Sequence, residues 1–226
     1  MADKYIYLFL SFYLLVLWLM IIIFRKDLVR KVIKASIGGG FAGLIAEVWY
    51  FVDYWQPPSL AGVSSVSIED FLFGFCITGI AVSIFDVTFC KKIRDEAKDR
   101  KGVFFILFLC GLISLLVFNN WLGINSIFVS SMAFIVISVI MILIRRDLFL
   151  PSIISGILTV IVIIPIYLLL YNWLSPDYWM RYWLLYDTEY GITVLGNIPV
   201  TEIIWYFSWG CLAGAGYDFA SGKIKV

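Results

Sequence analysis

Long apolar blocks dominate the sequence and restrict the chain to one class of fold. Of its 226 residues, 62% are hydrophobic and 15% are charged, far from the usual composition of a soluble domain. A helix crosses the hydrocarbon core of a bilayer with about 20 apolar residues. Seven blocks are long enough, at 5–24, 32–52, 68–90, 103–119, 124–144, 148–171 and 198–220. The sequence therefore predicts an all-α integral membrane protein with seven transmembrane helices.

The basic residues predict how these spans are oriented. Of the 17 Lys and Arg residues, all but Lys4 and Arg181 fall on one predicted side of the membrane. Basic residues accumulate on the cytoplasmic side of membrane proteins. The N-terminus is therefore predicted outside and the C-terminus inside, in a multi-pass protein of the cytoplasmic membrane. The net charge of +1 gives no reason to expect nucleic acid as a partner.

Several site chemistries are excluded or disfavoured by the sequence. The chain has no His, which removes His-ligated metals and His-dependent triads. Span two carries Gly38–Gly40 and Gly43, and close helix packing explains them better than a phosphate-binding loop, because no Gly-Lys-Ser/Thr follows. The four cysteines form no Cys-x-x-Cys pair and are interpreted as small core residues: Cys76, Cys90, Cys110 and Cys211. We expect neither a metal nor a cofactor.

Two stretches of the chain repeat each other. The pattern Trp-x-x-x-Asp-Tyr-Trp begins at Trp49 and again at Trp173. Further on, Asp70 and Glu202 each open an apolar block. Aligning these two acids brings two more pairs into register: Phe75 with Phe207, and Asp86 with Asp218. Several matches in the same order argue for an internal duplication.

The duplication predicts how the chain is organised. We expect a three-helix repeat at 1–101, a joining helix at 102–122 and a second three-helix repeat at 123–226. One joining helix leaves both repeats in the same orientation, so they are parallel and related by an axis near the membrane normal. Such a pseudo-twofold protein would offer two equivalent acid sites on its outer side.

Acidic residues cluster near the predicted outer ends of the spans. An acid in the apolar part of a membrane is costly unless it is protonated, paired or facing a wet cavity, so it marks a functional site. Burial favours its protonated form, whereas a helix N-terminus stabilises the ionised form by up to about 2 kcal/mol. The simple alternative is that these acids only begin helices in headgroup water. The candidates are Glu47, Asp53, Glu69, Asp70, Asp177 and Glu202.

Aromatic residues accompany the acids along the chain. Aromatic ring faces attract cations, so they could stabilise a carbocation. In a dry site, the acids would then act as Brønsted acids able to protonate an alkene. The candidate residues for binding such an apolar substrate are Trp49, Phe71, Phe73, Trp205, Tyr206 and Phe207.

Together these residues resemble a known family. The Trp-x-x-x-Asp-Tyr-Trp pattern, the Pro57-Pro58 loop and the helix start at 68–73 are similar to those of the heterodimer-type carotenoid (lycopene) cyclases of bacteria, archaea and fungi. That family is marked by a Pro-x-Glu-Glu helix start in each of two homologous three-span halves. Its fused members carry an extra joining span, so the resemblance covers nearly the whole chain.

Both copies of that helix start depart from the family pattern. The first has Ser67 in place of the proline and Asp70 in place of the second glutamate. The second keeps Pro199 but has Thr201 in place of the first glutamate. The resemblance implies that the proton donors are among Glu69, Asp70 and Glu202, with Glu47, Asp53 and Asp177 as partners or a proton relay.

The resemblance also implies an activity. It would be an intramolecular lyase or isomerase that protonates the terminal double bond of an acyclic carotene such as lycopene. The ring closes on the resulting cation, and proton loss gives an ionone ring without net redox. The expected partners are the lipid bilayer and an apolar polyene, in a cytoplasmic membrane of bacterial or archaeal type. A homo-oligomer is left open.

Other functions are compatible with parts of this pattern. A carotenoid hydratase would capture the same cation with water. A transporter built on parallel repeats would use the acids as coupling sites, but such sites usually lie near the middle of the membrane. A non-enzymatic assembly protein is the third alternative. A retinal-binding protein would need a buried Lys in the last span, and Lys223 follows that span.

Overall fold

The computed structural model describes residues 3–60, 62, 66–89, 93–95 and 98–225. Cys90, interpreted above as a core residue, and Lys91 and Lys92, counted among the cytoplasmic charges, lie outside these ranges. The chain forms two compact units, one of residues 1–79 with 161–203 and the other of 80–160 with 204–226.

Helices make up most of the chain, in the order that the apolar blocks predict. In the first half these are η1 (Asp3–Tyr5), α1 (Ile6–Phe24), α2 (Val29–Asp53) and α3 (Ile68–Phe89). Next come α4 (Lys101–Ser114), its π-helical continuation η2 (Leu115–Asn119), α5 (Ser126–Ile144), η3 (Arg146–Leu148) and α6 (Phe149–Tyr167). The last helices are the π-helical η4 (Leu168–Leu174), α7 (Tyr178–Tyr182) and α8 (Val200–Ser221).

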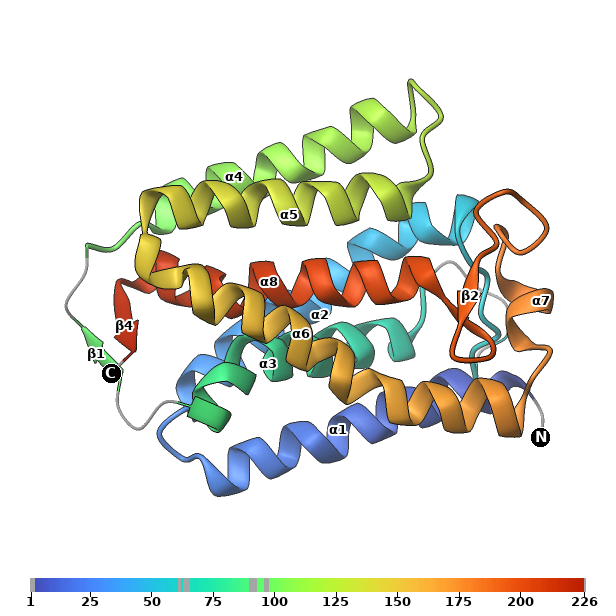
Figure 1. Cartoon of the computed structure of the whole chain (residues 1–226), viewed down its shortest axis with the longest axis horizontal. Coiled ribbons are helices and arrows are strands. Elements are labelled where there is room, and N and C mark those ends of the chain that lie inside the picture. Colours follow the sequence, from blue (N-terminus) through green and yellow to red (C-terminus); the bar gives the residue numbers. More distant parts are fainter. Residues whose placement is uncertain (1–2, 61, 63–65, 90–92, 96–97, 226) are drawn as a thin grey trace. The chain divides into compact units, whose positions relative to one another are not determined.

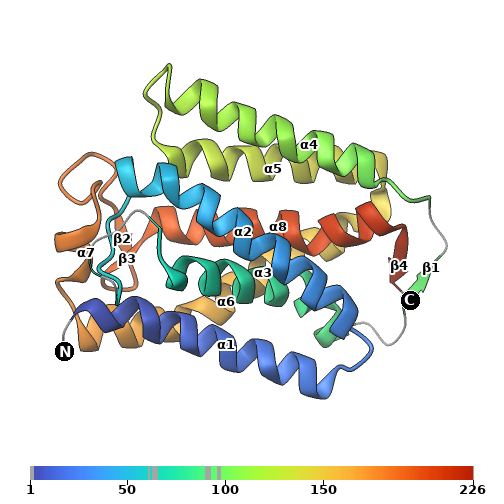
Figure 2. The ribbon, with the colours of Figure 1, turned by 180° about the vertical axis from the view of Figure 1, so that it is seen from behind.

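Among the residues that the structure describes, four short strands form two antiparallel pairs. In one pair, β1 (Ile93–Asp95) lies beside β4 (Lys223–Lys225), which follows the last helix (Figure 1). In the other, β2 (Thr193–Val194) pairs with β3 (Ile198–Pro199) and leads into α8 (Figure 2). These strands close loops at helix ends and leave the all-α class unchanged.

The helices confirm a membrane-embedded all-α protein. Within the described residues, six helices are long and apolar enough to cross a membrane. They correspond to the first six predicted spans, whereas α8 is not among the six. Most residues of α8 are buried by protein. A helix shielded from lipid needs less apolar surface, which explains why α8 tolerates Glu202 and Asp218.

Packing selects one face of α1, a helix that is apolar all round. Its buried residues Ile6, Leu10, Leu14 and Trp18 recur every four positions and are 0–9% exposed. The Trp18 indole N–H donates a hydrogen bond of 2.8 Å to the Ser36 hydroxyl of α2. The opposite face of α1 carries exposed apolar side chains, as a lipid-facing surface requires.

The same short turn follows the first helix of each predicted repeat. The guanidinium of Arg25 donates to both carboxylate oxygens of Asp27, at 2.9 and 2.8 Å. Arg145 pairs with Asp147 in the same two-pronged way. The Arg25 hydrogen bonds hold the pKa of Asp27 below its usual value. Because the same turn recurs at matching places, it is a further trace of the duplication.

Glycines allow α2 and α3 to pack closely. A Cβ at Gly39 would overlap the side chain of Thr78 and come within 2.7 Å of the Gly74 carbonyl oxygen. A Cβ at Gly43 would lie 2.9 Å from the Asp70 carbonyl oxygen. These glycines therefore bring the two helix backbones together beside the first turn of α3. In the other unit, Gly210 of α8 fits against α6 in the same manner.

This close packing predicts that alanine substitution affects stability differently at two neighbouring glycines. Gly39→Ala is expected to lower stability by about 1–3 kcal/mol, because the added methyl group overpacks the contact. Gly38→Ala is the matched control, because a Cβ there meets nothing within 4 Å. The midpoint of thermal unfolding in detergent measures both. Equal midpoints for the two variants would contradict the close α2–α3 contact.

Candidate functional site

The first turn of α3 is a capping box built from two residues of the predicted helix start. The backbone N–H and the hydroxyl of Ser67 each donate to Asp70 Oδ2 at 2.7 Å, and the Asp70 N–H donates back to Ser67 Oγ at 3.3 Å. This reciprocal arrangement satisfies N–H groups that a helix start otherwise leaves unpaired. The Tyr7 hydroxyl also lies within hydrogen-bonding range of the Asp70 carboxyl. Asp70 is 3% exposed, so it is both a cap and a buried acid.

Glu69 faces the preceding loop. Its Oε1 accepts a hydrogen bond of 2.8 Å from the Leu60 backbone N–H. Its Oε2 is buried without a hydrogen-bond partner among the described residues, and the side chain is 1% exposed. Glu69 thus anchors the loop between α2 and α3.

Glu202, in the first turn of α8, is held by two tyrosines. The Tyr54 hydroxyl donates to Oε1 at 2.6 Å, and the Tyr167 hydroxyl donates to Oε2 at 2.6 Å. The Tyr54 hydroxyl also lies 2.9 Å from Thr201 Oγ1, the neighbour of Glu202. The two Tyr54 contacts join residues more than a hundred positions apart in the chain, and the Tyr167 contact joins residues 35 positions apart. They fix both oxygens of a carboxyl group that is only 9% exposed.

Glu47 is a buried acid of α2. It is 5% exposed and within electrostatic range of both Asp70 and Glu202. The Trp55 indole N–H is within hydrogen-bonding range of its carboxyl group. In the described part of the chain, Glu47 Oε1 is buried without a hydrogen-bond partner. Because Glu47 is within electrostatic range of both acids, we call Glu47, Asp70 and Glu202 the acid cluster. The two equivalent acid sites stay a prediction.

A cage of aromatic rings adjoins this acid cluster. Trp179 is 1% exposed and lies parallel to Trp55, with ring centroids 6.0 Å apart. It also contacts Tyr171 at 4.7 Å and Tyr167 at 6.2 Å. Tyr7 meets the edge of Trp55 at 5.1 Å. We call Tyr7, Trp55, Tyr167, Tyr171 and Trp179 the aromatic cage. Its rings offer the π faces that stabilise a cation.

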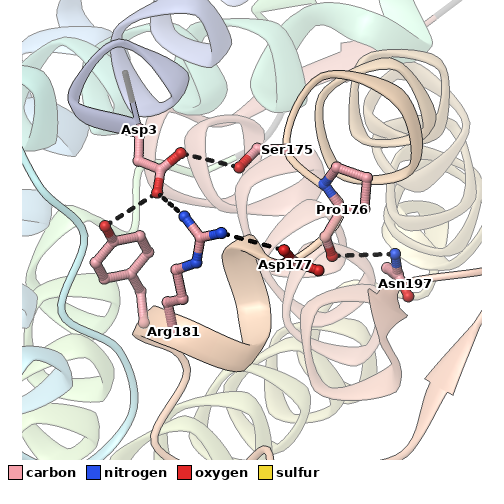
Figure 3. A network of polar contacts seen from close by, with 7 residues as sticks. Asp3, Ser175, Pro176, Asp177, Arg181 and Asn197 are labelled. Carbon is pink, nitrogen blue, oxygen red and sulfur yellow. Dashed lines mark hydrogen bonds and ion pairs between the residues drawn. The ribbon is translucent and has the colours of Figure 1, made fainter. Parts of the chain in front are cut away.

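The two candidate acids not yet described also lie outside this cluster, as Glu69 does. Asp53 is the last residue of α2 and is partly exposed. Asp177 precedes α7, and its side chain is 58% exposed. Asp177 accepts a hydrogen bond of 3.1 Å from Arg181, within a polar network that also includes Asp3 (Figure 3). The structure therefore places Asp177 in a surface ion pair.

The predicted aromatic residues divide between the two units. In the first unit, Phe73 contacts Tyr7 of the aromatic cage at 6.0 Å, and Phe71 stacks on Phe75 at 6.0 Å. Trp49 is partly exposed on α2. In the second unit, Trp205 contacts Tyr206 at 5.2 Å.

The rest of that second group is also packed against aromatic neighbours. Trp205 lies beside Phe134 and Trp209, with ring centroids 6.3 and 6.1 Å away. Tyr206 is 1% exposed, and Phe207 is partly exposed. A Cβ added at Gly156 would come within 2.9 Å of the Phe207 ring, so Phe207 packs against α6.

Sequence reasoning missed the tyrosines that hold Glu202. Tyr54 belongs to the repeated Trp-x-x-x-Asp-Tyr-Trp pattern, so the repeat was a signal that could have found it. Tyr167 lies in an apolar span without any motif around it. Tyr178, the repeat counterpart of Tyr54, is fully buried in α7, and burial raises its pKa well above the usual value. It therefore remains a neutral phenol.

Comparison with known proteins places this arrangement in context. A family model described as lycopene cyclase matches residues 4–88 and 125–220. The two matched segments cover most of the chain and leave out α4, the predicted joining helix. Neither a curated protein nor a solved structure matches the chain.

Proposed function

The chain belongs to the lycopene cyclase family, and from this premise we propose that it closes rings on the end groups of an acyclic, lycopene-type carotene by acid catalysis. The observation that carries the proposal is the contrast between two buried carboxyl groups. Both oxygens of Glu202 accept short hydrogen bonds from tyrosines, while Glu47 Oε1 has no partner in the described part of the chain. On this contrast we assign the negative charge to Glu202 and the proton to Glu47.

Glu202 takes the role of the anion. Hydrogen bonds from a hydroxyl group to an ionised carboxylate are about 2.5–2.7 Å long, shorter than those between neutral groups. Both phenol contacts of Glu202, at 2.6 Å, fall in that range. An ionised carboxylate can only accept hydrogen bonds, and both tyrosine hydroxyls donate to Glu202. A fixed negative charge near the reacting carbon stabilises the carbocation without reorganisation during the reaction.

Glu47 takes the role of the proton donor. An ionised carboxylate without full hydrogen bonding costs several kcal/mol when buried. The nearby Glu202 charge adds to this cost, because two close carboxyl groups do not both ionise cheaply. A protonated Glu47 can give its proton to the terminal carbon–carbon double bond. The internal double bond then attacks the cation, and loss of a ring proton to the Glu47 carboxylate restores the enzyme with no net change in redox state.

The remaining candidates support this pair. Asp70 holds the first turn of α3 in place through its capping box and contributes a further buried carboxyl group beside Glu47. Glu69 holds the loop that precedes α3. The aromatic cage supplies ring faces toward which positive charge can move. Asp53 and Asp177 are proposed to pass protons between this site and solvent, in keeping with their greater exposure.

We further propose that α8 is the seventh span and that the N-terminus lies outside. The burial of α8 supports this, since a shielded helix can cross the membrane with lower hydropathy. The distribution of basic residues supports the orientation. The acid cluster would then lie toward the outer side of the membrane.

Carotenoids extracted from lycopene-producing cells that express the protein test the proposed function. We expect cyclic carotenes with the same mass as lycopene, because ring closure adds and removes no atoms. A product heavier by one water would indicate hydration by the same cation. Cells carrying an empty vector are the control. An unchanged lycopene pool with the protein present in the membrane would contradict the proposal.

A further inference from the structure

The carboxylate of Asp3 holds together a segment that is far away in sequence. Asp3 Oδ2 accepts from Arg181 at 2.7 Å and from the Tyr182 hydroxyl at 3.1 Å, and Oδ1 accepts from the Ser175 hydroxyl at 3.1 Å (Figure 3). The Asp3 side chain is 14% exposed, although Arg181 is 49% exposed. We call these four residues the Asp3 clasp. It ties the beginning of α1 to both ends of α7.

Helix α7 carries the central ring of the aromatic cage. Trp179 lies between the clasp residues Ser175 and Arg181 in sequence, and it packs against Tyr167, which donates to Glu202. A helix of five residues has too few internal hydrogen bonds to be stable by itself. Its position therefore depends on external contacts, and the clasp supplies two of them, through Arg181 and Tyr182, and holds Ser175 just before the helix.

The same segment is joined to the second tyrosine that holds Glu202. The Gln56 N–H donates to the Tyr182 carbonyl at 2.9 Å, and the Leu184 N–H donates to the Tyr54 carbonyl at 2.9 Å. Trp55 and Trp183 form a bridge between the same two stretches. Loosening α7 would therefore loosen both Tyr54 and the Trp55–Trp179 stack. It would open the aromatic cage to water on the side of the Asp3 clasp.

The carbocation of the proposed reaction can meet two nucleophiles. Attack by the internal double bond forms a carbon–carbon bond and moves the charge into the ring, from which a proton leaves to a carboxylate. Attack by water forms a carbon–oxygen bond and gives a tertiary alcohol, after the added water loses one proton to the same carboxylate. Keeping water out of a site is the general way to prevent the second outcome.

We propose that Asp3 is a positioning residue that determines product specificity: by holding α7 against the aromatic cage, it excludes water and favours ring closure over hydration. This inference rests on the proposed function. It assigns to the Asp3 clasp an effect on the ratio of products, which a purely structural role would not change.

The ratio of hydrated to cyclic product, measured by mass spectrometry, tests this role. Removing a charge-assisted hydrogen bond shifts the equilibrium between the held and the loosened position of α7 on the order of tenfold or more. Asp3→Ala is therefore expected to raise the ratio about tenfold. Asp187→Ala is the matched control, because Asp187 is an exposed aspartate in the same outer segment. Its product ratio should equal that of the unmodified protein.

Two further variants distinguish the proposed role of Asp3 from a folding defect. Asp3→Asn keeps the size of the side chain and should shift the ratio in the same direction. The exchange Asp3→Arg with Arg181→Asp keeps only the ion pair, because an arginine cannot accept from the Ser175 and Tyr182 hydroxyls, so it should return the ratio part of the way toward that of the unmodified protein. A ratio unchanged in both Asp3→Ala and Asp3→Asn would overturn the inference. If the unmodified protein forms neither cyclic nor hydrated product, the proposed function itself fails, which is a different result.

Discussion

Glu202→Gln is expected to abolish ring closure while leaving the protein folded. The glutamine has nearly the same shape and can still contact Tyr54 and Tyr167, but it carries no charge. Removing one preorganised electrostatic group typically lowers turnover on the order of 10²–10³-fold. Here the group lost is the full negative charge proposed to face the carbocation. The initial rate of cyclic carotene formation in isolated membranes measures the effect.

Two comparisons make this result specific to the charge. Glu189→Gln is the matched control, because Glu189 is an exposed glutamate and its change should leave the rate intact. Tyr54→Phe removes one donor to Glu202 but leaves the charge, so its loss in rate should be clearly smaller than that of Glu202→Gln. A Glu202→Gln variant with ordinary turnover would refute the role of Glu202 as the stabilising anion.

Glu47→Gln should stop the reaction at an earlier point, before any cation forms. Glutamine cannot donate a proton to an alkene, and general acids contribute about 10²–10⁴-fold to rates. The buried amide carries no charge, so we expect the variant to fold and to retain the polyene. Turnover and the amount of lycopene bound to the purified protein are measured together.

The contrast between turnover and binding decides the role of Glu47. Loss of turnover with lycopene still bound supports a proton donor. Turnover within about threefold of the unmodified protein, far less than general acids contribute, would transfer the donor role to another acid, with Asp70 next in the cluster. Loss of binding as well would show that Glu47 shapes the site and does not act on the substrate.

Asp70 illustrates why a buried acid at a helix start needs the structure for its interpretation. The sequence admits two roles for it, a helix-capping residue and a proton donor. The structure shows Asp70 in a capping box with Ser67 and also close to Glu47. The cap occupies only Asp70 Oδ2, and in the described part of the chain Asp70 Oδ1 is buried without a hydrogen-bond partner, as Glu47 Oε1 is, so the Glu47→Gln measurement decides between the two acids.

Much of the fold could be predicted from the sequence because local patterns determine it. The apolar blocks predicted α1 to α6 within a few residues, since a helix in lipid must satisfy its own backbone and be apolar along its length. The Trp-x-x-x-Asp-Tyr-Trp repeat pointed to a duplication, and the family match falls in two corresponding segments. Residues at helix starts could also be predicted, because capping acts within one turn.

Only the tertiary structure decided which of these residues meet. Glu202 is held by Tyr54 and Tyr167, and Asp3 by Arg181, through contacts that join distant parts of the chain. No periodicity encodes such pairs, because each depends on how whole helices pack. The sequence by itself therefore determined the helices, their acids and the duplication. Packing determined which acids interact, because only folding brings Glu47 within electrostatic range of both Asp70 and Glu202.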